Sequence, residues 1–182
     1  MSERFSRRVF LRGLGVVAAA AALTACSSTN EAVNQALIEG AVGGIVAADC
    51  KIGRMTYWAA NATVPVYEIS FRIVMTNVSS KPVTLSGDNF ATTLDGTPIP
   101  PFNFSARDVG DADIWRTYDS LTIRPGEERS IALAYEISQP TYDSWYKSSR
   151  TVAVSFTCGN QRVTYTKNSR SDEITVSDIE TL

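Results

Sequence analysis

The side chains that most often perform chemistry in proteins are scarce in this chain. It has no histidine, three cysteines and three methionines among its 182 residues. The absence of histidine removes Ser-His-Asp and Cys-His nucleophiles, the commonest transition-metal ligand and the usual general base near neutral pH. A carboxylate pair, such as Glu68 with an acidic loop residue, remains the best candidate for catalysing acid–base hydrolysis. Because no segment of the sequence places two carboxylates across a cleft, we expect no enzyme activity and no cofactor. A carboxylate-dependent hydrolase stays the least favoured alternative.

A cluster of aspartates is the candidate for a metal site. Asp108, Asp111 and Asp113 lie with Asp119 in one short polar stretch, and hard cations such as calcium bind several oxygen ligands. The spacing of these residues matches no calcium loop. We therefore favour a solvated loop whose aspartates form local turns.

An aromatic group is the candidate for a ligand site. Tyr142, Trp145 and Tyr146 lie in a segment, residues 140–147, that we expect to connect two strands. On a loop such rings could stack on a sugar or contact a protein, because they offer a large contact area with few rotatable bonds. Alternatively, one or two of them close the end of the domain core, which is the interpretation we favour.

The first 26 residues have the three parts of an export signal: a basic start, an apolar run from Gly13 to Leu23 and a small-residue end. The run from Ser6 to Arg12 resembles the twin-arginine export motif, which Arg7, Arg8, Phe10 and Leu11 would form. The segment Leu23-Thr24-Ala25-Cys26 resembles the bacterial lipobox, in which a lipidated cysteine becomes the first mature residue. The apolar run falls short of the ~20 residues that cross a bilayer. We expect a signal peptide over 1–25 and a lipid anchor at Cys26 that holds the protein on the extracellular or periplasmic side of a membrane.

The rest of the chain divides into a tether and a β domain. Residues 26–48 form the predicted tether, in which Ala32, Val33, Ala36 and Leu37 have the spacing of a short helix. Residues 49–182 form the predicted domain, where apolar and polar residues alternate as they do in half-buried strands. The clearest alternation runs from Val66 to Val78 and recurs at 129–137 and 151–158. Weaker strands fit 51–58, 83–85, 89–94, 113–118, 121–123, 162–166 and 173–176. Many short strands separated by turn residues predict an all-β sandwich or barrel.

Three segments have the pattern of strands joined by turns: residues 75–85, where a strand turns into the next, residues 88–96, and Ile123-Arg124-Pro125-Gly126-Glu127 before a strand. Together they resemble a family of bacterial extracellular immunoglobulin-like domains. The resemblance covers residues 50–166. It implies an immunoglobulin-like antiparallel β-sandwich that serves as an interaction or structural module, and it supplies no catalytic residue.

Taken together, these features favour a binding or scaffold module for an envelope protein or glycan. An accessory subunit that joins an envelope complex through a strand edge or a sheet face is the alternative. The formal net charge of −2 argues against a nucleic-acid partner.

The two remaining cysteines predict a disulfide. With Cys26 committed to lipid, Cys50 and Cys158 form an even pair, and export would carry them to a compartment where disulfides persist. Cys158 continues the inward phase of Val152, Val154 and Phe156, so its sulfur should face the core. Two separate buried thiols are the alternative.

Overall fold

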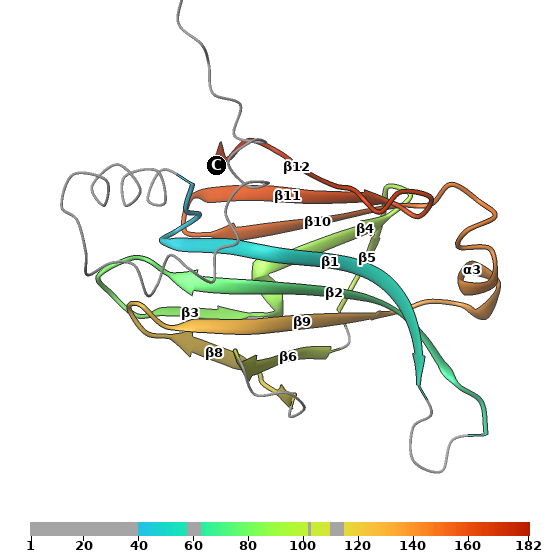
Figure 1. The fold of residues 1–182 in the computed structure, drawn as a ribbon, viewed down its shortest axis with the longest axis horizontal. Coiled ribbons are helices and arrows are strands. Elements are labelled where there is room, and N and C mark those ends of the chain that lie inside the picture. The colour runs from blue at the N-terminus through green and yellow to red at the C-terminus, as the bar shows by residue number, and fades with distance from the viewer. Residues whose placement is uncertain (1–39, 58–62, 102, 110–114) are drawn as a thin grey trace, which may run out of the picture.

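Two antiparallel sheets face each other in this protein (Figure 1). The computed structural model describes residues 40–57, 63–101, 103–109 and 115–182. The first sheet has the strand order β1 (Ile45–Tyr57), β2 (Val66–Asn77), β9 (Glu128–Glu136), β6 (Asn103–Asp108) and β7 (Arg116–Thr117). The second sheet has the order β12 (Ile174–Val176), β11 (Gln161–Asn168), β10 (Thr151–Cys158), β4 (Phe90–Leu94) and β5 (Thr97–Ile99), and β13 (Glu180–Thr181) also pairs with β11. The prediction of an all-β sandwich is therefore confirmed.

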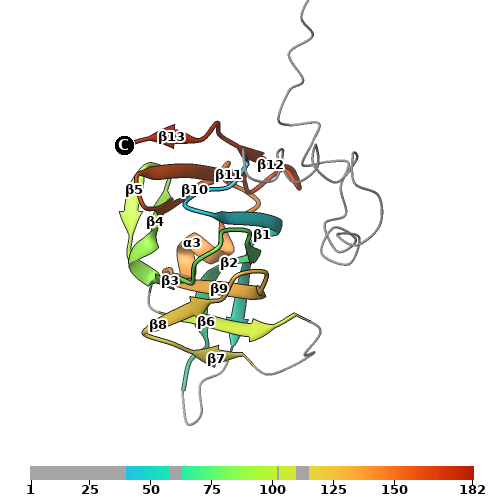
Figure 2. The ribbon, with the colours of Figure 1, turned by 90° about the vertical axis from the view of Figure 1, so that its left-hand side faces the viewer.

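The connectivity of the strands is that of an immunoglobulin domain. In that fold strands A, B, E and D form one sheet and strands C, F and G the other. Here β1, β2, β9 and β6 take the A, B, E and D places, and β4, β10 and β11 take those of C, F and G. Figure 2 shows β11, β10, β4 and β5 curving around the side opposite β2, β9, β6 and β7. A separate two-stranded ribbon pairs β3 (Val83–Ser86) with β8 (Ser120–Ile123).

The inward faces of the strands make one core between the sheets. On β2 the alternate residues Ile69, Phe71, Ile73 and Met75 are buried, as their period of two predicted. The Phe71 ring contacts rings from the second sheet, with centroids 6.1 Å from that of Phe90 and 5.8 Å from that of Tyr165. Burial of such apolar surface is the main favourable term in folding. The core therefore fixes which residues of β2 face outward.

The sandwich begins earlier in the chain than residue 49. Strand β1 starts at Ile45, and Ala41, Val42 and Ile45 are buried in the core. The apolar run from Ala41 to Ala48 thus belongs to the domain and not to the tether. The predicted export signal, the predicted anchor residue Cys26 and the predicted tether helix lie outside the described residues. Within the described ranges no helix is both long enough and apolar enough to cross a membrane.

Three strands and a short helix were not predicted from the sequence. They are β5, β6, β13 and α3 (Gln139–Asp143), which lies at one end of the sandwich (Figure 1). The α3 turn begins at Ser138, whose hydroxyl accepts a hydrogen bond from the Thr141 amide at 3.3 Å, as N-cap residues commonly do. Of the predicted strand at 113–118, the described part contains only β7.

The predicted disulfide between Cys50 and Cys158 is absent, and both are free thiols. Cys158 ends β10, where its sulfur lies 3.8 Å from the carbonyl oxygen of Gly43. The chain around Cys50 lies at the other end of the β10–β11 hairpin, where Lys167 Nζ donates to the Ile52 carbonyl at 2.9 Å. Several extended residues separate these places, more than about 10 Å at ~3.3 Å per residue. Disulfides require Cα atoms within about 7 Å, so the strand register keeps the thiols apart.

Candidate functional site

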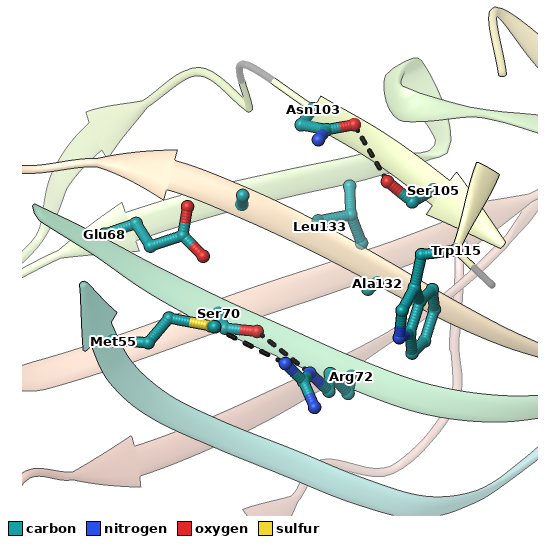
Figure 3. Close-up of a pocket in the computed structure, with 10 residues that line it drawn as sticks. Met55, Glu68, Ser70, Arg72, Asn103, Ser105, Trp115, Ala132 and Leu133 are labelled. Carbon is teal, nitrogen blue, oxygen red and sulfur yellow. Dashed lines mark hydrogen bonds between the residues drawn. The ribbon is translucent and has the colours of Figure 1, made fainter. Parts of the chain in front are cut away.

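Glu68 departs from the pattern of its strand. On β2 the residues Glu68, Ser70 and Arg72 face away from the core, and outward residues of a sheet are ordinarily solvated. Arg72 follows this rule, but Glu68 is only 6% exposed. It lines a hollow of about 220 Å³ on the outer face of the first sheet. Figure 3 shows the Glu68 side chain reaching from β2 toward β9.

Small side chains on β9 make the hollow. Antiparallel pairing sets Ala134 between Ser70 and Asn103, and Ala132 between Arg72 and Ser105. Each alanine leaves space between longer neighbours on both sides. Met55 of β1 lies opposite Glu68 in the register, and Trp115 closes the hollow beside β6 (Figure 3).

The Glu68 carboxylate has no compensating partner among the described residues, because neither a hydrogen bond nor an ion pair reaches it there. Burial raises its pKa above the ordinary value, and the positive charge of Arg72 opposes that rise. The residue directly opposite in the register is Glu136, which is exposed and also acidic. Like charges placed opposite each other in a sheet destabilise it. This end of the hollow is therefore an acidic site suited to a cation or a hydrogen-bond donor.

The other end of the hollow is basic. Arg72 donates from Nε to Ser70 Oγ at 3.3 Å and from Nη2 to Met55 Sδ at 3.6 Å, and neither acceptor carries charge. Its guanidinium carbon lies 5.7 Å from the centre of the Trp115 ring, and that of Arg107 lies 4.8 Å from the same centre. The contact orients the Arg72 guanidinium without neutralising it.

A polar side chain of β6 borders the neutral middle of the hollow. Asn103 Oδ1 accepts hydrogen bonds from Ser105 Oγ at 2.9 Å and from Thr117 Oγ1 at 3.3 Å. These two donors hold the amide group in place. The hollow thus presents a carboxylate, an amide, hydroxyls and a guanidinium along one face of a sheet. Such a set of groups is suited to binding a polar ligand.

Comparison with known proteins adds no family. No protein-family model matches the chain, and no curated protein matches it. Among solved structures, the yjhA protein from Bacillus subtilis is 16% identical with a TM-score of 0.39, over 62% of this chain and 73% of that one. An uncharacterized β-sandwich protein from Clostridium difficile 630 is 15% identical with a TM-score of 0.41, over 68% of this chain and 83% of the other. A protein from Archaeoglobus fulgidus is 13% identical with a TM-score of 0.33, over 72% and 95% of the two chains. The assignment of the fold rests on the strand pairing of this chain.

The predicted aromatic group is mostly structural. Trp145 is 2% exposed and belongs to the core, so it cannot stack on a ligand. The Tyr142 ring packs against Tyr67 at 5.0 Å. The Arg54 guanidinium lies 4.2 Å from the centre of the Tyr142 ring and 4.6 Å from that of Tyr146. Only Tyr146 of the three is exposed. The favoured interpretation, that rings of this segment close the end of the core, holds for Trp145.

Of the aspartates in the candidate metal cluster, the structure describes only Asp108 and Asp119. Asp108 makes an ion pair with Arg129, while Asp111 and Asp113 lie outside the described residues. No group of three or more Cys, Asp or Glu side chains in the described ranges is placed to hold a metal ion. The export residues Arg7, Arg8, Phe10 and Leu11 also lie outside these ranges.

Among the described residues, strand pairing places Glu68 directly opposite a second carboxylate, that of Glu136 on β9. Glycosidases place two carboxyl groups on either side of the bond that is cleaved. Glu68 and Glu136 instead lie side by side on neighbouring strands of one sheet face. A ligand on this face would meet both from the same side, which suits binding better than acid–base cleavage.

Proposed function

We propose that this protein is a non-catalytic binding module of the cell envelope, held at a membrane by lipid on Cys26, and that its partner binds in the hollow on the outer face of the first sheet. Glu68 carries the proposal. A buried charge without a partner lowers the stability of a fold, and a ligand that supplies the missing interaction would offset that cost. Functional sites are where such uncompensated groups concentrate.

The architecture supports a rigid binding surface. The hollow rests on strands β2, β9 and β6, which are paired over their length and backed by the core. Sites built on strands hold their side chains more firmly than sites on loops. Ligand binding would therefore require little reordering of the polypeptide, which preserves affinity.

Filling the hollow tests this function. Ala134→Phe places a ring between Ser70 and Asn103, where it should block the site without entering the core. Ala91→Phe is the matched control, because Ala91 is exposed on the outer face of β4 in the second sheet. Both would be made in the Cys26→Ala background, which removes the proposed anchor, and added to isolated envelope fractions.

We expect the background protein and the Ala91→Phe variant to be retained on the envelope fraction and the Ala134→Phe variant to be lost. Circular dichroism would show that all three are folded. Equal retention of the two phenylalanine variants would contradict a function for the hollow.

A further inference from the structure

The outer face of the first sheet is polarised along the strand direction. The registers place Met55, Glu68 and Glu136 in one row across β1, β2 and β9. Two residues further along β2, Gly53, Ser70, Ala134 and Asn103 form an uncharged row. The next row contains Lys51, Arg72, Ala132 and Ser105. The hollow therefore runs from an acidic end, across a neutral middle, to a basic end.

No ion pair joins Glu68 to Arg72 in the described structure. Their Cα atoms are about 13 Å apart at ~3.3 Å per residue, and the Arg72 guanidinium reaches back along the strand to Ser70 Oγ and Met55 Sδ. Its positive charge lowers the pKa of Glu68 from a distance, without a direct contact. Lys51 adds a second positive charge in the Arg72 row. A neutral ligand would leave Glu68 and Arg72 without a directly bonded counter-charge. A ligand with a positive group at one end and a negative group at the other would satisfy both.

We propose that the hollow binds a zwitterion of the short-peptide type, with its ammonium group at Glu68 and Glu136 and its carboxylate at Arg72. The inference rests on the proposed function and names the ligand class of the same site. Ser70 and Asn103 in the uncharged row face the peptide groups between the two charges. The guanidinium of Arg72 presents paired N–H donors that match a carboxylate.

The size of the hollow limits the ligand. Pockets for drug-sized molecules hold about 300–1,000 Å³, and this one holds about 220 Å³. A peptide of two or three small residues suits this volume.

A set of triglycine derivatives tests the inference by calorimetry on the purified full chain. Triglycine carries both charges, N-acetyl-triglycine lacks the ammonium group, and triglycinamide lacks the carboxylate. We expect triglycine to bind and the loss of either charge to weaken binding at least about tenfold, which corresponds to about 1.4 kcal/mol. Maltotriose serves as the neutral glycan probe.

Two variants assign the charges to residues. Glu68→Gln should weaken triglycine binding, because the ammonium group of triglycine loses the carboxylate that binds it. The same variant should leave N-acetyl-triglycine binding unchanged, because that peptide has no ammonium group. Arg72→Gln should weaken triglycine binding and leave triglycinamide binding unchanged. Lys81→Gln, in the exposed turn after β2, is the control and should bind triglycine like the unmodified chain.

Equal affinity for the three peptides, no heat with triglycine at millimolar concentration, or preference for maltotriose would overturn the zwitterion inference. In any of these cases the proposed function would still stand if Ala134→Phe abolished retention on the envelope and Ala91→Phe did not. The two failures are therefore distinguishable.

Discussion

Glu68 is the buried acidic residue of the outer sheet face. Its folded pKa is raised above the ordinary value, so the folded state binds the proton more tightly than the unfolded state does. The stability of the protein should therefore rise as the pH falls through that raised pKa. Above it, the ionised carboxylate is buried without a hydrogen bond or ion pair among the described residues, Glu136 lies opposite, and the positive charge of Arg72 opposes the rise in pKa.

Glu68→Gln should accordingly stabilise the protein at neutral pH, because the amide carries no charge to bury. The gain should shrink as the pH falls toward and below the ordinary carboxyl value of 4.5, where Glu68 itself becomes neutral. Thermal unfolding of both proteins from pH 4 to pH 8, a span chosen around the ordinary Asp and Glu pKa values of about 4, would measure this. A gain independent of pH, or a loss at neutral pH, would show that Glu68 is compensated in a way the structure does not contain.

Trp145 differs from Tyr146 although they are neighbours. Trp145 is 2% exposed, and removal of a buried tryptophan side chain typically costs about 3–5 kcal/mol. Tyr146 is 61% exposed and contacts Arg54, an exposed cation–π contact worth at most about 1 kcal/mol. Urea unfolding of Trp145→Ala and Tyr146→Ala should therefore give a large loss for the first and a small one for the second. Similar losses would place Trp145 outside the core.

At the scale of elements, the strands β2, β9 and β10 were predictable because apolar residues occupy most of their inward positions. Strand β6 was not, because its inward residues are only Phe104 and Ala106 between polar neighbours. The hollow depends on β6 and on the long-range pairing that sets Ala132 and Ala134 beside Glu68. The pairing register between strands that are distant in the chain cannot be predicted from a single sequence. Glu68, Ser70 and Arg72 therefore had the pattern of an ordinary solvated strand face.

The disulfide prediction failed for a related reason. The prediction that Cys158, at the end of β10, faces inward was correct, since Cys158 packs against the core. The position of Cys50 depended on where β1 begins, and the earlier start at Ile45 places Cys50 at the other end of the hairpin. Periodicity predicts which face a residue occupies, but not its partner along the strand.

Both thiols should therefore stay free in protein taken from cells. Alkylation in denaturant, followed by mass spectrometry, should label Cys50 and Cys158. In the folded protein Cys50 should react slowly, because burial raises its pKa to about 12 and the thiolate is the reactive form. Protein that resists alkylation until it is reduced would contain the disulfide that this register forbids.

At the scale of the whole molecule, we propose that the lipid anchor and the sandwich are separate units. The core among the described residues is built from side chains between Val42 and Tyr165. Cys26→Ala should therefore release the protein from membranes and leave its melting temperature unchanged. Carbonate washing of membranes followed by immunoblotting would measure release. A variant that stayed with the washed membranes would contradict lipid anchoring at Cys26.

The proposed partner binds the outer face of the first sheet. Site-specific photo-crosslinking in living cells can detect this contact, with p-benzoylphenylalanine placed at Ala134 in one strain and at Ala91 in another. We expect an adduct from position 134, in the hollow, and none from position 91, on the outer face of the opposite sheet. An adduct from position 91 and none from position 134 would contradict it.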